Sequence, residues 1–391
     1  MRRRRVRTYS ATALAVGLLV ATASTSNAFG QSSGHQRGLA RSEVTSHKPF
    51  RGPTSSLKPF NPNAPAGLKP PTHVPRVAAW EAQSTATLWL QYTNGIRQSL
   101  QGSGIQLLTG NADADPTTMV SALRSFLQRG VGALITVPVG GNQPLTPIEQ
   151  QAIGSGAYVT SELAGPAQSV ITVDQYNVGF VQGKAAAQYI DSHLHGKASV
   201  LYFNANNVSP LLIPREKGAL AGLRTGGSGI QVVDNISITP DVTQGEQDMS
   251  TALQAHPDIN VVLGDDESVL GAVHAYQSLG KISSLAYASG VDGSPDALAA
   301  IQAGSTPYKV DYGFNYGVMG YVNGQMIRRW FAGKSVPMVM DFKPAAMNSA
   351  ATINAYNRAA SKPKSANVAA YVSLLGTISY GSRSSYVDYS P

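Results

Sequence analysis

Residues 115–138 read DPTTMVSALRSFLQRGVGALITVP and contain the unit on which the fold prediction rests. Asp115 places a capping side chain before Pro116, which suits the first position of a helix. Apolar residues recur on one face of this helix at Val120, Leu123 and Leu127. The apolar run 133–137 then reads as a strand, so the segment predicts a helix followed by a strand.

The same alternation continues along the chain. Ten apolar, β-rich stretches are separated by helical patterns; they are residues 74–80, 105–109, 133–137, 158–160, 170–173, 199–203, 230–233, 259–263, 285–288 and 308–311. Strands that alternate with helices predict an α/β protein with doubly wound parallel sheets. Residues 146–149 (TPIE) predict another helix start, with a capping box. Because so many strands fit poorly in one open sheet, we expect two lobes with a cleft between them.

Charge and composition exclude several classes of protein. The 391 residues carry a formal net charge of +8, but 11 bases and one acid lie at or before Lys69, which leaves 19 bases and 21 acids beyond it. The predicted folded part is therefore slightly acidic, and nucleic acid is not an expected partner. The chain has no cysteine, which excludes a disulfide framework, a thiol nucleophile and a lipoprotein anchor.

The first residues predict export from the cytoplasm. Arg2 to Arg5 precede an apolar run over 11–23 and the small-residue end Ser26-Asn27-Ala28. This order is typical of a secretory signal peptide over 1–28, because the apolar run is shorter than the ~20 residues of a spanning helix. Residues 29–73 are rich in Pro, Ser and Gly and predict a linker. We expect the mature protein in a periplasm or outside the cell.

Five segments resemble a known family in their order and spacing. They are residues 110–116, 127–138, 174–179, 255–267 and 290–296. The chain resembles the sugar-type periplasmic binding proteins of ABC importers, which have the type I two-lobed fold. The resemblance implies a hinge between an N-terminal lobe of residues 74–173 plus 312–340 and a C-terminal lobe of residues 174–311 plus 341–347. Residues 348–391 form a C-terminal extension past the usual family end, to which the sequence assigns no structure.

The resemblance also implies a set of ligand-binding residues. They are Trp89, Glu162, Asp174, Arg215, Asp265, Asp292 and Asp311. The acids at predicted strand ends lie where open α/β sheets bind ligands, and carboxylates with a planar guanidinium suit a ligand rich in hydroxyls. An aromatic ring such as Trp89 would stack on the apolar face of the ligand. The competing interpretation is structural: Asp265 or Asp266 as a helix cap, Arg215 on a solvated face and Trp89 in the core.

Departures from the family pattern bear on the ligand. Where family members have an asparagine, an aromatic ring or an arginine, this chain has Ala86, Leu88, Leu163 and Pro240, and Asp265 and Asp311 replace amides. The predicted site is therefore more acidic and less aromatic than a simple pentose site. The ligand is expected to be a sugar, a polyol or an amino sugar.

The resemblance implies a solute-binding protein that delivers its ligand to the inner-membrane permease of an ABC importer. A sensory protein that presents its closed form to a membrane receptor is the alternative, followed by a secreted carbohydrate-active enzyme. Carboxylate spacing selects no glycosidase pair, no G-x-S-x-G motif occurs, and Arg328 stands where a phosphate loop before Gly333 requires glycine. We expect a monomer without enzymatic activity, cofactor or metal.

Overall fold

The computed structural model describes residues 75–139, 144–162, 167–209, 212–334, 336, 339–374 and 378–381. Of residues 339, 371–374 and 378–381 it describes only the backbone. The predicted signal peptide 1–28, the predicted linker 29–73, Leu163 and the last ten residues lie outside the described part of the chain.

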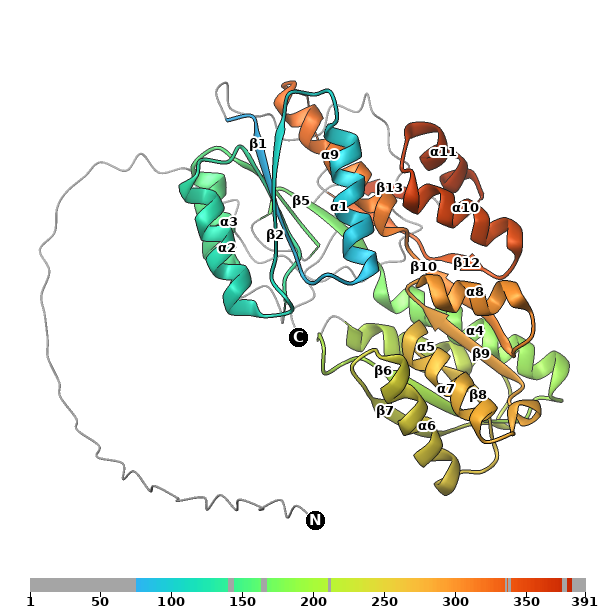
Figure 1. Cartoon of the computed structure of the whole chain (residues 1–391). Helices are drawn as coiled ribbons and strands as arrows, with labels where there is room; N and C mark the ends of the chain where they lie inside the picture. Colours follow the sequence, from blue (N-terminus) through green and yellow to red (C-terminus); the bar gives the residue numbers. More distant parts are fainter. Residues whose placement is uncertain are drawn as a thin grey trace, which may run out of the picture. The chain divides into compact units, whose positions relative to one another are not determined.

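The strands form two sheets (Figure 1). Their bounds are β1 Val77–Ala82, β2 Gln106–Asn111, β3 Ala133–Thr136, β4 Tyr158–Ser161, β5 Ser169–Val173, β6 Ala198–Asn204, β7 Ile230–Ser237, β8 Ile259–Leu263, β9 Tyr287–Val291, β10 Tyr308–Gly313, β11 Val339–Phe342, β12 Ala345–Met347 and β13 Ile378–Gly381. The first sheet has the order β13-β11-β5-β4-β3-β1-β2 and the second β12-β10-β9-β8-β6-β7. All pairings are parallel except β11 with β13 and β10 with β12, each at one edge.

Helices connect the parallel strands, as parallel pairing requires. Their bounds are α1 Thr87–Leu100, α2 Pro116–Gln128, α3 Thr146–Gly154, α4 Gln175–His193, α5 Ile213–Leu223, α6 Val242–Ala255, α7 Asp266–Ser278, α8 Pro295–Ala303, α9 Tyr316–Phe331, α10 Ala350–Ser361 and α11 Ser365–Leu374, with a short 3-10 turn η3 at Ile282–Ser284. In the described part of the chain, no helix is long and apolar enough to span a membrane.

The predicted α/β class with two parallel-dominated sheets is confirmed. Each of the ten predicted stretches overlaps a strand, although the stretch predicted at 285–288 begins at Tyr287 and runs to Val291. Helix α2 begins at Pro116, and Asp115 caps it by accepting a hydrogen bond from Thr118 N at 2.6 Å. Its buried stripe is centred on Met119, Leu123 and Phe126, with Val120 and Leu127 at its margins. The boundaries of the two lobes remain a prediction.

The predicted capping box at residues 146–149 is wrong. The N-cap of α3 is Leu145, which makes no side-chain capping bond. Glu149 is fully buried instead, and its Oε1 accepts a hydrogen bond from the Thr136 hydroxyl at 2.7 Å. Tertiary burial thus overrides the local capping pattern, and desolvation by that burial raises the pKa of Glu149 to about 7, although hydrogen bonds with Thr136 and Ser161 oppose the shift.

Glycines bring α4 and α5 into backbone contact. A Cβ atom on Gly179 would lie 1.8 Å from Arg215 O, and one on Gly183 would lie 2.0 Å from Ala219 O. The α1–α9 pair has the same construction, because a Cβ on Gly95 would lie 2.1 Å from Gly317 O. These contacts hold the first turns of α5 and α9 against α4 and α1, and so fix the backbone from which candidate ligand-binding residues project.

The C-terminal extension is partly structured. Helix α10 begins with a capping box at Ser349 and buries Ile353, Tyr356 and Ala359. Tyr356 O accepts a hydrogen bond from Asn315 Nδ2 at 2.9 Å, at the start of α9. Strand β13 pairs with β11 and so extends the first sheet. The extension therefore contributes to both the core and the connection between β10 and α9.

Candidate functional site

Arg215 lies in the first turn of α5, which follows β6, and is 6% exposed. Its Nη1 and Nη2 donate to the two carboxylate oxygens of Asp292 at 3.2 and 3.3 Å, and its Nε donates to Gln175 Oε1 at 2.8 Å. The guanidinium carbon also lies 5.8 Å from the centre of the Phe314 ring. A bidentate pair of this kind fixes the plane of the guanidinium, so Arg215 cannot be a solvated side chain.

Asp292 follows β9 and has a positive φ of 115°, which is uncommon for a residue with a Cβ atom. Two bonds hold its backbone there: its N–H donates to Tyr312 O at 3.1 Å, and its carbonyl accepts from the Tyr356 hydroxyl at 3.3 Å. The surrounding structure thus maintains a strained conformation that presents the carboxylate to Arg215.

Asp265 follows β8 and caps helix α7. Its Oδ1 accepts a hydrogen bond from Ser268 N at 2.9 Å, as the structural interpretation predicted. Its Oδ2 is buried and has no hydrogen-bond partner among the described residues. Burial raises the pKa of Asp265 to about 6, an effect that the Arg215 charge partly opposes. Capping therefore uses one oxygen and leaves the other available.

Asp311 lies in β10 and is completely buried. Its Oδ2 accepts a hydrogen bond from the Tyr308 hydroxyl at 3.1 Å, and its Oδ1 has no partner among the described residues. Gly290 makes room for this pair, because a Cβ there would lie 1.9 Å from the Tyr308 hydroxyl oxygen. Burial and the charge of Asp292 raise the pKa of Asp311 to about 8.

Asp266 completes the acidic cluster, which we define as Asp265, Asp266, Asp292 and Asp311 with Arg215. Its carboxylate accepts a hydrogen bond from Ser294 N, and burial together with Asp311 raises its pKa well above the usual range. The structure therefore brings Asp265, Asp292 and Asp311 together at the carboxyl ends of the strands of the second sheet. They interact electrostatically with Arg215 and with one another.

Asp174 lies at the start of α4. It is the N-cap of α4, where its Oδ1 accepts from Asn177 N at 3.0 Å, and its charge acts on Asp341 of β11. The next residue, Gln175, makes the contact with Arg215. Asp174 thus caps a helix with one oxygen, its neighbour Gln175 carries the contact with Arg215, and a ligand role for Asp174 stays a prediction.

Trp89 projects from the first turn of α1 and is half-buried. Its ring meets the Tyr316 ring edge-on, with centroids 5.2 Å apart, and lies 6.1 Å from Tyr92 and 6.2 Å from Trp80. The cluster of these four rings, which we call the aromatic cluster, gives Trp89 one packed side and leaves part of its surface exposed.

Glu162 follows β4, at the carboxyl end of the first sheet. Its Oε1 is buried and has no partner among the described residues, and burial raises its pKa to about 8. Its charge acts on Tyr316, on which Asp292 and Arg215 also act. Tyr316 is therefore the side chain that links the aromatic cluster electrostatically to the acidic cluster.

Sequence reasoning missed Gln175, Tyr308, Tyr316 and Tyr356. Tyr316 directly follows the β10–α9 connection, which was a usable signal. Gln175 and Tyr356 act through contacts between distant segments, for which the sequence carries no local pattern. Tyr308 lies only three positions before Asp311, but both residues belong to one predicted strand and nothing in the strand pattern indicates their contact. Among the described residues, no group of three or more His, Cys, Asp or Glu side chains could hold a metal ion.

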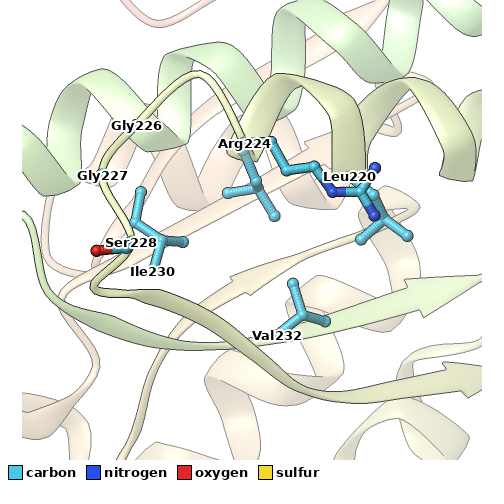
Figure 2. Close-up of a pocket in the computed structure, with 8 residues that line it drawn as sticks. Leu220, Arg224, Gly226, Gly227, Ser228, Ile230 and Val232 are labelled. Carbon is cyan, nitrogen blue, oxygen red and sulfur yellow. The ribbon is translucent and has the colours of Figure 1, made fainter.

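Two surface pockets lie elsewhere. One, of about 540 Å³, lies between the end of α5 and edge strand β7, where Leu220, Arg224 and Ile230 line it (Figure 2). The other, of about 520 Å³, has Arg97, Gly102 and Leu107 among its lining residues, beside edge strand β2. Neither lining contains a residue of the acidic or aromatic cluster, and neither presents converging buried polar groups, so we give them less weight as ligand sites.

Comparison with known proteins gives a consistent result. Residues 79–335 match the sequence model of a family described as "Periplasmic binding protein domain". The ribose import binding protein RbsB of Bacillus subtilis is 30% identical over 213 residues, which cover 53% of this chain and 66% of that protein. A putative rhizopine-binding protein of Rhizobium meliloti is 26% identical over 217 residues, covering 53% and 69% of the two chains.

Solved structures share the fold. An ABC transporter solute binding protein from Bacillus halodurans with bound myo-inositol has a TM-score of 0.64 at 17% identity, covering 73% of this chain and 99% of that one. The myo-inositol binding protein of Caulobacter has a TM-score of 0.60 at 21% identity, covering 74% and 97%. At such identities the likeness concerns the fold.

Proposed function

Because the chain belongs to the periplasmic binding protein family, we propose that it is an extracytoplasmic solute-binding protein that captures a sugar-like ligand and delivers it to an ABC importer. The observation that carries the proposal is the Arg215–Asp292 pair, buried at the carboxyl ends of the second sheet, where open α/β sheets bind ligands. The names of the relatives support a sugar-like ligand.

The two clusters offer complementary chemistry to such a ligand. Arg215 and the acids provide donors and acceptors for hydroxyl groups, while Trp89 provides a rigid apolar surface that excludes water. The proposed binding residues are Trp89, Glu162, Asp174, Arg215, Asp265, Asp292 and Asp311, to which Gln175 is added because it contacts Arg215. Closure of the two lobes about a hinge would then be favoured because the closed state binds the ligand more tightly.

The remaining parts of the proposal concern export and partners. A leader at 1–28 would direct the chain across the membrane, and the permease of an importer would be the partner of the closed monomer. The relatives are named as binding proteins, which supports a role without catalysis.

Isothermal titration calorimetry of the mature protein against sugars and polyols tests the proposal. We expect saturable binding of at least one of them, lost in Arg215→Ala and in Asp292→Ala while circular dichroism remains that of a folded protein. Unchanged affinity in both variants would exclude the acidic cluster as the site. Chromatography would show whether the protein converts the ligand to a product. Such a conversion would exclude a role limited to binding.

A further inference from the structure

The acidic cluster has more negative groups than its one cation can balance. Arg215 forms its ion pair with Asp292. Among the described residues, Asp265, Asp266 and Asp311 form no ion pair. The three are 4%, 3% and 0% exposed, so water does not replace the missing cation.

Two buried oxygen atoms in the cluster also lack a hydrogen-bond donor. Asp265 Oδ2 and Asp311 Oδ1 have no partner among the described residues, although the second oxygen of each side chain is bonded. Both side chains interact electrostatically with Arg215 and Asp292, so they belong to one group around the proposed ligand position. The Ser268 side chain and the Gly293 backbone lie near enough to lower the pKa values of Asp265 and Asp311, but neither reaches Oδ2 of Asp265 or Oδ1 of Asp311 with full hydrogen-bond geometry. Because buried polar atoms are normally satisfied, these two oxygens leave room for a donor that the ligand supplies.

The protonation states indicate how much positive charge is needed. Burial and neighbouring carboxyl groups raise the pKa of Asp311 to about 8 and that of Asp266 well above its usual range, which favours the neutral form of both groups. The pKa of Asp265 is raised only to about 6, so it is ionised at neutral pH. With Arg215 and Asp292 cancelling, one negative charge remains, on Asp265.

We infer that the ligand is a polyhydroxylated molecule that carries one protonated amine, with its ammonium group on Asp265 Oδ2 and within reach of Asp311. The inference rests on the proposed function and specifies the ligand class of the same site. An ammonium group has three donors and one charge, which matches the ionised Asp265 and its unpartnered Oδ2; the neutral Asp311 carboxyl offers one donor and its remaining acceptor capacity to the same part of the ligand. A metal ion fits less well, because the described residues contain no cluster with metal-binding geometry.

Matched pairs of ligands test the inference in calorimetry at pH 6.5. The pairs are glucosamine with glucose, galactosamine with galactose, and an aminodeoxy-inositol with myo-inositol, each repeated with 1 mM calcium or with a chelator. Asp265→Asn removes the charge but keeps an oxygen that can cap α7, and Asp311→Asn is the second variant. Asp296→Asn removes an exposed acid from the first turn of α8 and is the control.

We expect at least one amine to bind the wild-type protein 10-fold or more tightly than its hydroxyl partner. Removing one member of a buried charge pair weakens binding by roughly 30-fold or more. Asp265→Asn should therefore weaken binding of the amine by about that factor and change the affinity for its hydroxyl partner less than 3-fold. The ratio of the two affinities should then be close to one. Asp296→Asn should leave both affinities unchanged.

The outcomes separate the inference from the proposed function. If the hydroxyl members bind as tightly as the amines, or bind only with calcium, the amine-bearing class is wrong and the solute-binding function stands. If no member of any pair binds, both are wrong. An amine preference that survives in both Asp265→Asn and Asp311→Asn would contradict the assignment to these two carboxyl groups.

Discussion

The carboxyl ends of the two sheets are built alike but differ in chemistry. Each is bordered by a helix pair in which glycines allow backbone contact, α1 with α9 and α4 with α5. The first sheet presents the aromatic cluster with Glu162, whose Oε1 is buried, whereas the second presents the acidic cluster with one cation, Arg215. The difference shows that the fold determines where the binding site lies, while the side chains determine which ligand it can bind.

The largest effect is expected where the charged cluster depends on one cation. Arg215→Met should lower the free energy of unfolding by roughly 3–5 kcal/mol, because it leaves Asp292, whose side chain is only 20% exposed, without its partner. Urea denaturation would measure this. Adding Asp292→Asn should recover part of the loss, since no charge is then stranded. Equal stability of the single and the double variant would mean that the pair does not hold this region together.

The pH dependence of stability should reveal the buried acids of both sheets. Burial raises the pKa of Glu149 and of Asp311, to about 7 and about 8, so the folded state binds protons more tightly than the unfolded state. Stability is therefore fully present near pH 4 and falls as the pH rises toward 8. For Glu149, whose pKa rises from 4.5 to about 7, this fall amounts to roughly 3 kcal/mol.

Two substitutions separate the contributions of the two sheets to this fall in stability. Glu149→Gln keeps an acceptor for Thr136 and should flatten the stability profile between pH 5 and 8 without affecting ligand binding. Asp311→Asn should flatten it as well and also alter affinity. Thermal unfolding across that range, with Asp296→Asn as an exposed control, would measure both. A profile that rises toward pH 8 in the wild-type protein would contradict the account of the buried acids.

The two glycine contacts should be comparably sensitive. Gly179→Ala and Gly95→Ala should each destabilise the protein by about 1–3 kcal/mol, because the added Cβ would meet backbone atoms at 1.8 and 2.1 Å. Both should also weaken binding, Gly179→Ala through the displacement of Arg215 and Gly95→Ala through the displacement of the α1–α9 pair that carries Trp89. Gly154→Ala, in α3 with nothing within 4 Å of the added atom, is the matched control and should be neutral or slightly stabilising. Similar denaturation midpoints for all three variants would count against the close packing.

The smallest effect is expected at Tyr356, in the C-terminal extension. Tyr356→Phe removes the hydroxyl that donates to Asp292 O and should lower stability by about 1 kcal/mol. It should weaken ligand binding by a few fold, because Asp292 is held in a strained conformation. Calorimetry would detect this. No change in affinity would show that Asp292 is positioned without the extension.

The sequence predicted the architecture well because periodicity and helix starts are local. Residues 115–138 formed the predicted helix and strand, and Asp115 caps as its side chain suggests. Local signals failed at Glu149, where a capping pattern was overridden by burial against Thr136. The structure of residues 348–381 was not predicted, because its stability depends on packing of α10 and on pairing of β13 with β11.

The candidate site was only partly predictable. Strand ends located Asp265, Asp292 and Asp311, but a carboxylate after a strand can cap a helix or face a ligand, and Asp265 offers one oxygen to each role. Asp174 proved to be a cap. The contacts of Gln175 with Arg215 and of Tyr356 with Asp292 join residues 40 and 64 positions apart, so only the folded chain reveals them.

The most direct test of the central claim is a crystal structure of the protein with its tightest-binding sugar, polyol or amino sugar. We predict ligand oxygen or nitrogen atoms within hydrogen-bond distance of Arg215 and Asp265, and the apolar face of the ligand against the Trp89 ring. A ligand seated instead in the pocket beside β7, near Leu220 and Ile230, would contradict the claim that the two clusters form the binding site (Figure 2).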